Sequence, residues 1–407
     1  MEILRPVVVP YAWGSKHGIA GLQGRPVPSA GPEAELWMGA HPSAPSGAAE
    51  STLDALIAAD PERELGPSCV ARFGPRLPFL LKVLSADRAL SIQVHPSRIQ
   101  AEAGFLAEND HGLPPGDPAR NYVDDWPKPE LLCALTSFEV LAGLRSPADA
   151  AALLRALAVP DLAPLAAELE AATGPQALSR ALATILAWPE DGRAGLVGAV
   201  VRACAVLAPA DPDPSAAGPR AAAGPHAAAA AAVVREAAHH PGDLGLVAML
   251  LMRHTTLAPG QAVFMAAGGL HTYLRGTGVE VLANSDNVVR AGLTGKHVDV
   301  PELLELLDPA VTVPVLLPSP LGDGIGRFDI PAPEFGLAIA DLAASPVTLP
   351  GSGPRIVLCT DGAALLRDQA GETVKLARGE SCFVSAADGP LRASGPAHLF
   401  LAAPGDS

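Results

Sequence analysis

The chain has 407 residues, 49% of them hydrophobic, which predicts two or three folded domains and excludes a largely disordered protein. Its formal net charge of −15 makes nucleic acid an unsuitable partner, because binding a phosphate backbone requires a positive surface. The five cysteines are scattered, the N-terminus has no secretion-signal pattern, and no apolar run has the length and flanks of a membrane span, so we expect a cytoplasmic protein without membrane contact.

Residues 1–145 predict short antiparallel strands separated by turns rich in proline and glycine. The apolar runs 77–84 and 89–95 are the clearest strand candidates, and the second ends in Gln93-Val94-His95. Side chains two residues apart lie on the same face of a strand, so Gln93 and His95 could approach one centre together. The alternative is a solvent-facing glutamine and an ordinary hydrogen-bonded histidine at a strand edge.

Lys128 and Glu130 form the next candidate pair, in the segment Trp126-Pro127-Lys128-Pro129-Glu130. Two prolines stiffen this segment and fix how the ammonium and carboxylate groups are presented. The pair is either part of a site or an ordinary surface ion pair.

Residues 146–255 change to an alanine- and leucine-rich pattern that predicts a helical insertion. Ser146 and Pro147 are typical of a helix start, with serine as the N-cap and proline in the first turn. We expect a loop over 211–225 and a further helix over 227–238.

From residue 256 strands return, with one short helix after Pro301. Gly260 is followed, after five residues, by Ala266-Ala267-Gly268-Gly269-Leu270-His271, which is similar to the second motif of the cupin superfamily, where a metal-binding histidine follows a glycine turn. Ala266 stands where that motif has proline, and Arg275 where it has asparagine. The alternative is a β-hairpin whose histidine packs against the next strand.

Taken together, these segments resemble the class I phosphomannose isomerases, zinc-dependent members of the cupin superfamily. The resemblance rests on five stretches in family order, namely 11–15, 35–42, 90–96, 128–130 and 271–296. It implies an enzyme of carbohydrate metabolism, including GDP-mannose biosynthesis, that interconverts mannose 6-phosphate and fructose 6-phosphate through a cis-enediol. A small sugar phosphate is then the partner, and the family favours a monomer.

The resemblance implies one Zn²⁺ per chain, bound by Gln93, His95, Glu130 and His271. Imidazole nitrogen and carboxylate oxygen suit zinc, and a single anionic ligand leaves the site electrophilic. For proton transfer the family pattern offers Glu280, Arg290, Lys296 and Asp286, each of which could equally position the sugar. Glu280 has the chemistry of a base, whereas Arg290 suits the negative charge of an enediolate.

For the phosphate group we expect Lys82, Ser91 and Lys128, which lie in or beside the matched stretches. With so few lysines in an acidic chain, cations gathered in these stretches indicate a local anion pocket.

The expected architecture is mainly β with an α-helical insertion, made of two cupin-type jelly-roll barrels and a helical domain. The domains are a discontinuous catalytic cupin of residues 1–145 and 256–316, a helical insertion of residues 146–255, and a metal-free C-terminal β-barrel of residues 317–407. Alternatives are an iron-dependent cupin oxygenase, against which Gln93 and the 285–294 stretch argue, and a non-catalytic sugar-binding cupin.

Overall fold

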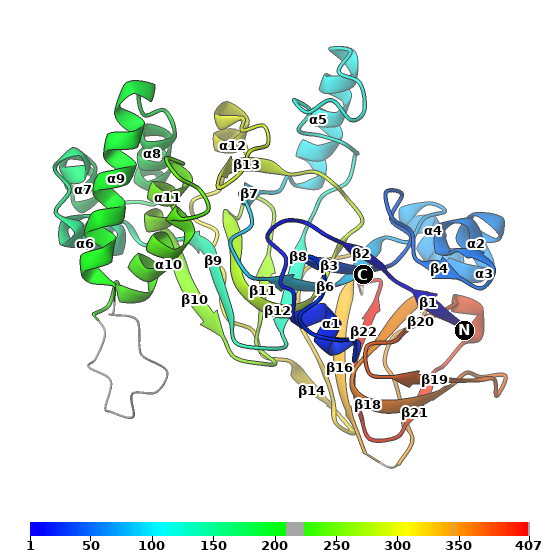
Figure 1. Cartoon of the computed structure of the whole chain (residues 1–407). Helices are drawn as coiled ribbons and strands as arrows, with labels where there is room; N and C mark the ends of the chain where they lie inside the picture. The colour runs from blue at the N-terminus through cyan, green and yellow to red at the C-terminus, as the bar shows by residue number, and fades with distance from the viewer. Residues whose placement is uncertain (209–223, 344, 406–407) are drawn as a thin grey trace, which may run out of the picture.

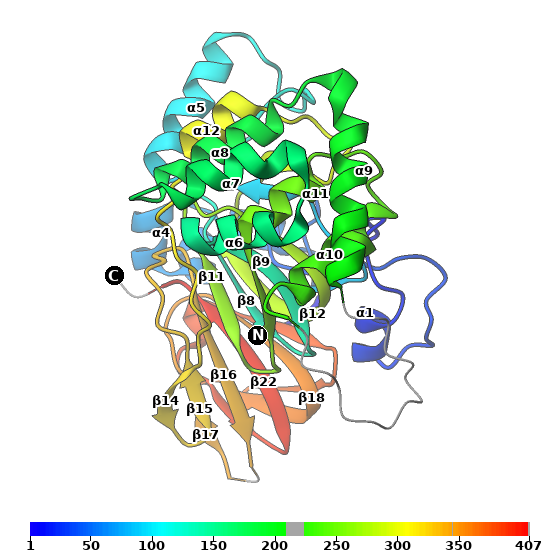
Figure 2. The ribbon, with the colours of Figure 1, turned by 90° about the vertical axis from the view of Figure 1, so that its left-hand side faces the viewer.

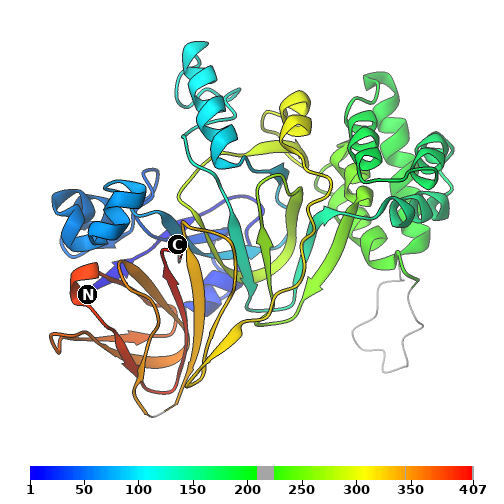
Figure 3. The ribbon, with the colours of Figure 1, turned by 180° about the vertical axis from the view of Figure 1, so that it is seen from behind.

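The computed structural model describes residues 1–208, 224–343 and 345–405. Strands within these ranges form two antiparallel sheets, of ten and twelve strands, and helices gather beside them. The ten-stranded sheet lies in the middle of the molecule, with a helical block at one end and the twelve-stranded sheet at the other (Figures 1 and 3). The expected combination of a mainly β fold with a helical block is therefore confirmed at this level.

The ten-stranded sheet combines segments from before and after the helical block. Its longest strand, β12, pairs with β6, β7, β8 and β9. The members are β2 (Val7–Val9), β3 (Glu35–Met38), β6 (Phe79–Ala86), β7 (Ile92–Val94), β8 (Glu130–Ala134), β9 (Phe138–Leu144), β10 (Met252–Leu257), β11 (Ala262–Met265), β12 (His271–Ala283) and β13 (Val289–Gly292). Strands predicted over 77–84 and 89–95 are present as β6 and β7.

The twelve-stranded sheet contains the C-terminal part of the chain and also its first strand. Its members are β1 (Glu2–Arg5), β4 (Gly47–Ala48), β5 (Ser51–Thr52), β14 (Ser319–Gly322), β15 (Ile325–Arg327), β16 (Gly336–Leu342), β17 (Val347–Thr348), β18 (Arg355–Arg367), β19 (Thr373–Ala377), β20 (Ser381–Val384), β21 (Arg392–Ser394) and β22 (Ala397–Ala403). Strand β1 pairs with β20, placing Glu2 opposite Phe383. Because this pairing joins the two ends of the chain, no local sequence pattern indicated it.

The helical block packs against one end of the ten-stranded sheet and is seen from its outer side in Figure 2. It consists of α6 (Pro147–Leu157), α7 (Ala163–Glu170), α8 (Gln176–Leu186), α9 (Glu190–Leu207), α10 (Ala227–Ala237) and α11 (Gly245–Ala248). Ser146 caps α6 as predicted, since its Oγ accepts a hydrogen bond from the Asp149 amide at 3.1 Å. The helix predicted over 227–238 is confirmed as α10, whereas most of the loop predicted over 211–225 lies outside the described residues.

Four helices between residues 53 and 110 were not predicted. They are α2 (Leu53–Ala59), α3 (Pro61–Leu65), α4 (Pro67–Phe73) and α5 (Arg98–Asp110). Helix α5 begins with a capping box, in which Ser97 and Gln100 satisfy each other's backbone amides, so its start was readable from the sequence. The short helix α12 (Val300–Leu306) is present where one was expected. Among the helices that the structure describes, none combines the length and apolar character needed to cross a membrane.

Candidate metal centre and active-site pocket

Three buried side chains from three places in the ten-stranded sheet meet at one point. His95 directly follows β7, Glu130 begins β8 and His271 begins β12. Their ligand atoms all lie within 4.8 Å of one another. The Nε2 atoms of His95 and His271 lie 3.3 Å and 3.4 Å from the two carboxylate oxygens of Glu130. Two imidazoles and one carboxylate at these separations form a donor set suited to a zinc ion.

The orientation of both imidazole rings supports metal binding. His95 Nδ1 lies 2.9 Å from the Asn287 carbonyl oxygen, and His271 Nδ1 lies 3.0 Å from that of Gly269. Each Nδ1–H can therefore donate to a carbonyl, which leaves Nε2 as a lone-pair donor toward the centre. Among the described residues, His95 Nε2 and Glu130 Oε2 are buried without a hydrogen-bond partner. A cation between them would satisfy both atoms.

Electrostatics keep the ligands in the protonation states that a metal needs. Burial lowers the pKa of His95 to about 4, although Glu130 opposes this shift, so the ring is neutral at pH 7. Burial disfavours the charged form of Glu130, but His95, His271 and Lys128 outweigh it and hold its pKa well below the usual value. His95 thus presents a neutral imidazole and Glu130 a carboxylate, as metal binding requires.

Gln93 reaches the same centre through strand register. Across β12, β7 and β13, Gln93 lies opposite His271 on one side and opposite Arg290 on the other. Directly opposed residues in antiparallel strands point to the same face, so these three side chains form one row. The Gln93 carboxamide nitrogen lies 3.4 Å from His271 Nε2. The fourth expected ligand therefore lies beside the other three.

A second row places a lysine among carboxylates. Lys82 lies opposite Glu280 and also opposite Trp37. Its Nζ is 3.8 Å from a Glu280 carboxylate oxygen, 3.6 Å from a Glu35 oxygen and 4.9 Å from the Trp37 ring centroid. Burial opposes the charge on Lys82, but the two carboxylates outweigh it and raise its pKa.

Glu280 has the raised pKa expected of a proton-transfer group. Burial and the nearby Glu130 charge raise its pKa to about 8, while Lys82 acts in the opposite direction. A carboxyl group that titrates near neutral pH can both accept and return a proton. The hydroxyl of Tyr273 is also buried near Glu280, without a hydrogen bond of standard geometry to any described residue.

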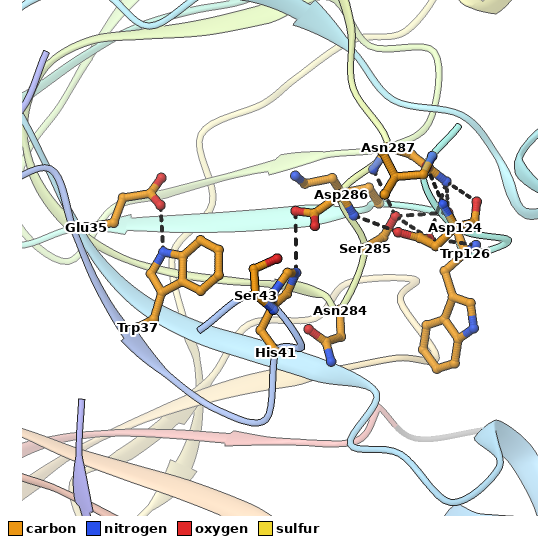
Figure 4. Close-up of polar contacts among 12 residues, drawn as sticks. Glu35, Trp37, His41, Ser43, Asp124, Trp126, Asn284, Ser285, Asp286 and Asn287 are labelled. Carbon is orange, nitrogen blue, oxygen red and sulfur yellow. Dashed lines mark hydrogen bonds and ion pairs between the residues drawn. The ribbon is translucent and has the colours of Figure 1, made fainter. Parts of the chain in front are cut away.

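The remaining candidates lie at the edge of the centre. Lys128 Nζ is 3.9 Å from Glu130 Oε1. Asp286 Oδ1 is 3.4 Å from His41 Nε2, a contact drawn in Figure 4. Burial opposes the charge on Asp286, but the His41 bond and Lys128 outweigh it and lower its pKa to about 2. Asp286 is thus a fixed anion, which makes it a weak candidate for the base.

The loop after β12 is held by Asp124, which the sequence analysis did not single out. Asp124 Oδ1 accepts a hydrogen bond from Ser285 Oγ at 2.8 Å, and its Oδ2 accepts one from the Asp286 amide at 2.8 Å (Figure 4). Asn287 Nδ2 donates to the Asp124 carbonyl oxygen at 2.7 Å. Because the Asn287 carbonyl also orients His95, this network connects the loop to the metal centre.

A pocket of about 670 Å³ opens onto this centre. Its lining includes all the residues expected to contact the substrate and two of the four expected metal ligands. They are Lys82, Ser91, Gln93, Lys128, Glu130, Glu280, Asp286, Arg290 and Lys296. Trp13 and Trp37 also form part of its wall. Lining residues that were not proposed for the site include Tyr11, Glu35, Arg88, His240, Tyr273 and Thr294.

Two of these residues differ in how far the sequence could have indicated them. Glu35 lies in the stretch 35–42 that resembles the family, so that resemblance could have identified it as a pocket residue. His240 lies in the loop that follows α10, where it is partly buried and lines the pocket. Burial of a residue by a distant part of the chain cannot be read from local sequence.

Comparisons with known proteins agree with this geometry. Residues 1–147 match the family described as phosphomannose isomerase type I, catalytic domain. The chain is 35% identical to a mannose-6-phosphate isomerase of Escherichia coli and 37% identical to one of Salmonella typhimurium, in each case over 98% of both chains. It also superposes, with a TM-score of 0.87 and 33% identity, on a crystal structure of a mannose 6-phosphate isomerase bound with zinc and yttrium, covering 99% of both chains.

Because these alignments include 98% or more of the chain, they include the metal centre, the pocket and both sheets. A solved single-residue variant of the Salmonella typhimurium phosphomannose isomerase gives the same result, with a TM-score of 0.88 and 33% identity over 99% of both chains. The chain therefore belongs to the type I phosphomannose isomerase family.

Proposed function

We propose that the protein interconverts mannose 6-phosphate and fructose 6-phosphate at one zinc ion per chain. The observation that carries this proposal is the buried His95–Glu130–His271 cluster beside the Lys82–Glu280 pair in a single pocket. Family membership supplies the substrate class, since the full-length relatives are named mannose-6-phosphate isomerases.

Zinc would be held by Gln93, His95, Glu130 and His271. The two ligand atoms without a hydrogen-bond partner and the carbonyl-oriented imidazole rings fit such an ion, and the cysteines of the chain are absent from the cluster that the structure describes. When bound, zinc supplies Lewis acidity that polarises or orients sugar oxygens.

Glu280 is the best-supported residue for proton transfer. Isomerisation to the ketose removes the proton on C2 and returns one to C1, so a single base near both carbons suffices for the cis-enediol route. The Glu280 carboxyl is buried, and its pKa of about 8 keeps it close to the working pH. Lys82, 3.8 Å away, stabilises the carboxylate form that accepts the proton.

Ion pairing supports a different phosphate site from the one expected. Lys82 and Lys128 each have a carboxylate within 4.0 Å, whereas none of the described carboxylates lies that close to Arg290 or Lys296. Unpaired cations are better placed to receive a phosphate than paired ones. We therefore assign the phosphate to Arg290 and Lys296, with Ser91 beside them in the pocket wall, and assign Lys82 and Lys128 to the inner end of the pocket.

We also propose the finer architecture and setting expected from the sequence. The two antiparallel sheets support two cupin-type jelly rolls, and the apolar interior of the C-terminal sheet supports a barrel without metal. We retain the division into residues 1–145 with 256–316, 146–255 and 317–407, and the pairing of β1 with β20 supports counting the first strand with the C-terminal sheet. Five free, buried cysteines support a reducing, cytoplasmic setting, and a monomer remains the proposed state.

A substrate panel tests the proposal most simply. Purified protein is assayed with mannose, glucose and galactose 6-phosphates, with and without added zinc. We expect turnover of mannose 6-phosphate alone, lost after chelation and restored by zinc. Sugar binding without turnover would favour the non-catalytic alternative. Oxygen consumption with iron as the native metal would favour an oxygenase.

A further inference from the structure

We infer that Asp243, a residue of the helical block, positions the Thr294–Lys296 segment of the pocket wall and, through it, the ammonium group of Lys296. This inference rests on the proposed function, because Lys296 is assigned there to the phosphate. The helical block would then contribute to the active site by holding one wall of the pocket in position.

Residues 293–296 form a short stretch of backbone in the wall of the active-site pocket. They follow β13 and line the active-site pocket of about 670 Å³. Thr294 also lines a second cavity of about 360 Å³ on the other side, together with Asp243 and Gly242. Leu293 has a positive φ of 54°, which is uncommon for residues other than glycine and indicates a constrained turn. Leu293 is anchored in the core, whereas Thr294 borders both cavities and depends more on hydrogen bonds to hold its position.

Asp243 links the helical block to this segment, because one carboxylate oxygen bonds to each. Its Oδ1 accepts from the Gly245 amide at 2.7 Å, and its Oδ2 accepts from the Thr294 amide at 3.3 Å. Thr294 Oγ1 in turn accepts from the Lys296 amide at 3.0 Å. A continuous series of contacts therefore leads from the helical block to the backbone of Lys296.

The two backbones also approach each other too closely for side chains. A Cβ on Gly292 would meet Gly245 Cα at 2.8 Å, and a Cβ on Gly245 would meet the Leu293 amide nitrogen at 2.8 Å. Both are shorter than ordinary contacts, so glycine is required on both sides. The close approach fixes the distance between the block and the wall, and it places the Asp243 carboxylate where it can reach Thr294.

Lys296 is the side chain most dependent on this support. None of the described carboxylates lies within 4.0 Å of its Nζ, which is 5.7 Å from the Tyr11 ring centroid. Its location is thus set by the backbone that carries it. A small shift of that backbone would move the ammonium group away from a phosphate, and misplacement of this kind weakens binding strongly.

Asp243→Asn tests the inference, because the amide group replaces one acceptor oxygen with a donor that faces a backbone N–H. We expect the KM for mannose 6-phosphate and the inhibition constant of inorganic phosphate each to rise about tenfold, with kcat within about threefold of the wild type. Zinc content and Tm should match those of Asp161→Asn, an exposed carboxylate elsewhere in the helical block that serves as control.

A double-mutant cycle shows whether Asp243 acts through Lys296. In a Lys296→Ala background, Asp243→Asn should raise KM by no more than about twofold further. Independent, multiplying effects would overturn the inference, as would an unchanged KM in Asp243→Asn or a fall in kcat alone. Thr294→Val, which keeps the side-chain shape but removes the acceptor for Lys296, should reproduce the rise in KM even if Asp243→Asn fails to fold. An inactive wild type would instead refute the proposed function.

Discussion

The two sheets of the protein share an antiparallel β architecture and differ in what they bury. The ten-stranded sheet buries His95, Glu130, His271, Lys82 and Glu280 around one pocket. The C-terminal sheet buries an apolar cluster that includes Val357, Leu376 and Leu399, and its strand β18 begins with one buried charged residue, Arg355. Buried charges are costly unless they are paired or bind a ligand, so the first interior is built for chemistry and the second for stability. Comparable folds thus carry different roles because of a few side chains.

The largest effect on turnover is expected from breaking the metal centre. His271→Ala removes a buried ligand, so zinc should be lost and kcat should fall by about 1,000-fold or more. Metal analysis and a coupled assay measure both. His398→Ala, on β22 of the other sheet, is the matched control and should keep zinc and activity. If His271→Ala kept full activity, the chemistry would not belong to this centre.

Glu280→Gln separates proton transfer from binding. We expect kcat to fall by about 100-fold or more and KM to change by less than about threefold, because the lost group acts in the transition state. Steady-state kinetics with mannose 6-phosphate give both constants. Glu372→Gln, an exposed carboxylate of the C-terminal region, should behave as the wild type. Near-normal turnover by Glu280→Gln would show that another group is the base.

Lys296→Ala tests the assigned phosphate site. The KM for mannose 6-phosphate should rise about tenfold with a smaller change in kcat, since a charge-assisted contact to the bound phosphate is lost. Lys375→Ala on β19, which removes an exposed lysine from the C-terminal sheet, should change neither constant. If Lys82→Ala raised KM and Lys296→Ala did not, the phosphate site expected from the sequence would be right after all.

Leu399→Ala should produce the opposite pattern, with stability lost and catalysis retained. Leu399 is fully buried in the apolar interior of the C-terminal sheet, and truncating such a leucine costs about 2–5 kcal/mol. We expect a lower Tm, with kcat/KM within about twofold of the wild type at temperatures below unfolding. A large loss of kcat/KM with an unchanged Tm would contradict the division between the sheets.

The smallest expected effect concerns the attachment of the helical block to the ten-stranded sheet. Glu139 on β9 contacts His254 Nε2 at 3.4 Å and Arg235 Nη2 on α10 at 2.9 Å. The hydrogen bond with His254 lowers the Glu139 pKa to about 2 from its ordinary 4.5, and Arg235 adds to the shift against burial. A carboxylate with a depressed folded-state pKa stabilises the fold above the unfolded-state pKa, and this contribution disappears as the pH falls toward 2.

The measurement is urea denaturation of the wild type and Glu139→Gln at pH 7 and pH 3. The variant should be less stable at pH 7, and the difference should shrink at pH 3. A difference that is constant with pH would show that the charge of Glu139 does not contribute.

Much of the site was predictable because short stretches carry it. Gln93, His95, Glu130 and His271 fall within matched stretches, and three of them form the one metal-type cluster found among the described residues. The helix start at Ser146 was likewise a local signal, and the structure contains it.

Long-range contacts account for what the sequence analysis missed. The ion pairs of Lys82 depend on the register of β3, β6 and β12, which strand patterns do not specify. The contribution of His240 to the pocket and of β1 to the C-terminal sheet depends on parts of the chain that are far apart in sequence. Helix α5 is different, because its capping box of Ser97 and Gln100 is a local signal that would have predicted its start.

The most direct test of the account is to titrate zinc into metal-stripped protein while measuring both bound metal and turnover of mannose 6-phosphate. We predict no activity in the stripped protein, a linear rise in activity, and saturation of both signals at one zinc per chain, in the ten-stranded sheet. Full activity without metal, or a second tightly bound zinc per chain, would contradict the proposed difference between the two sheets.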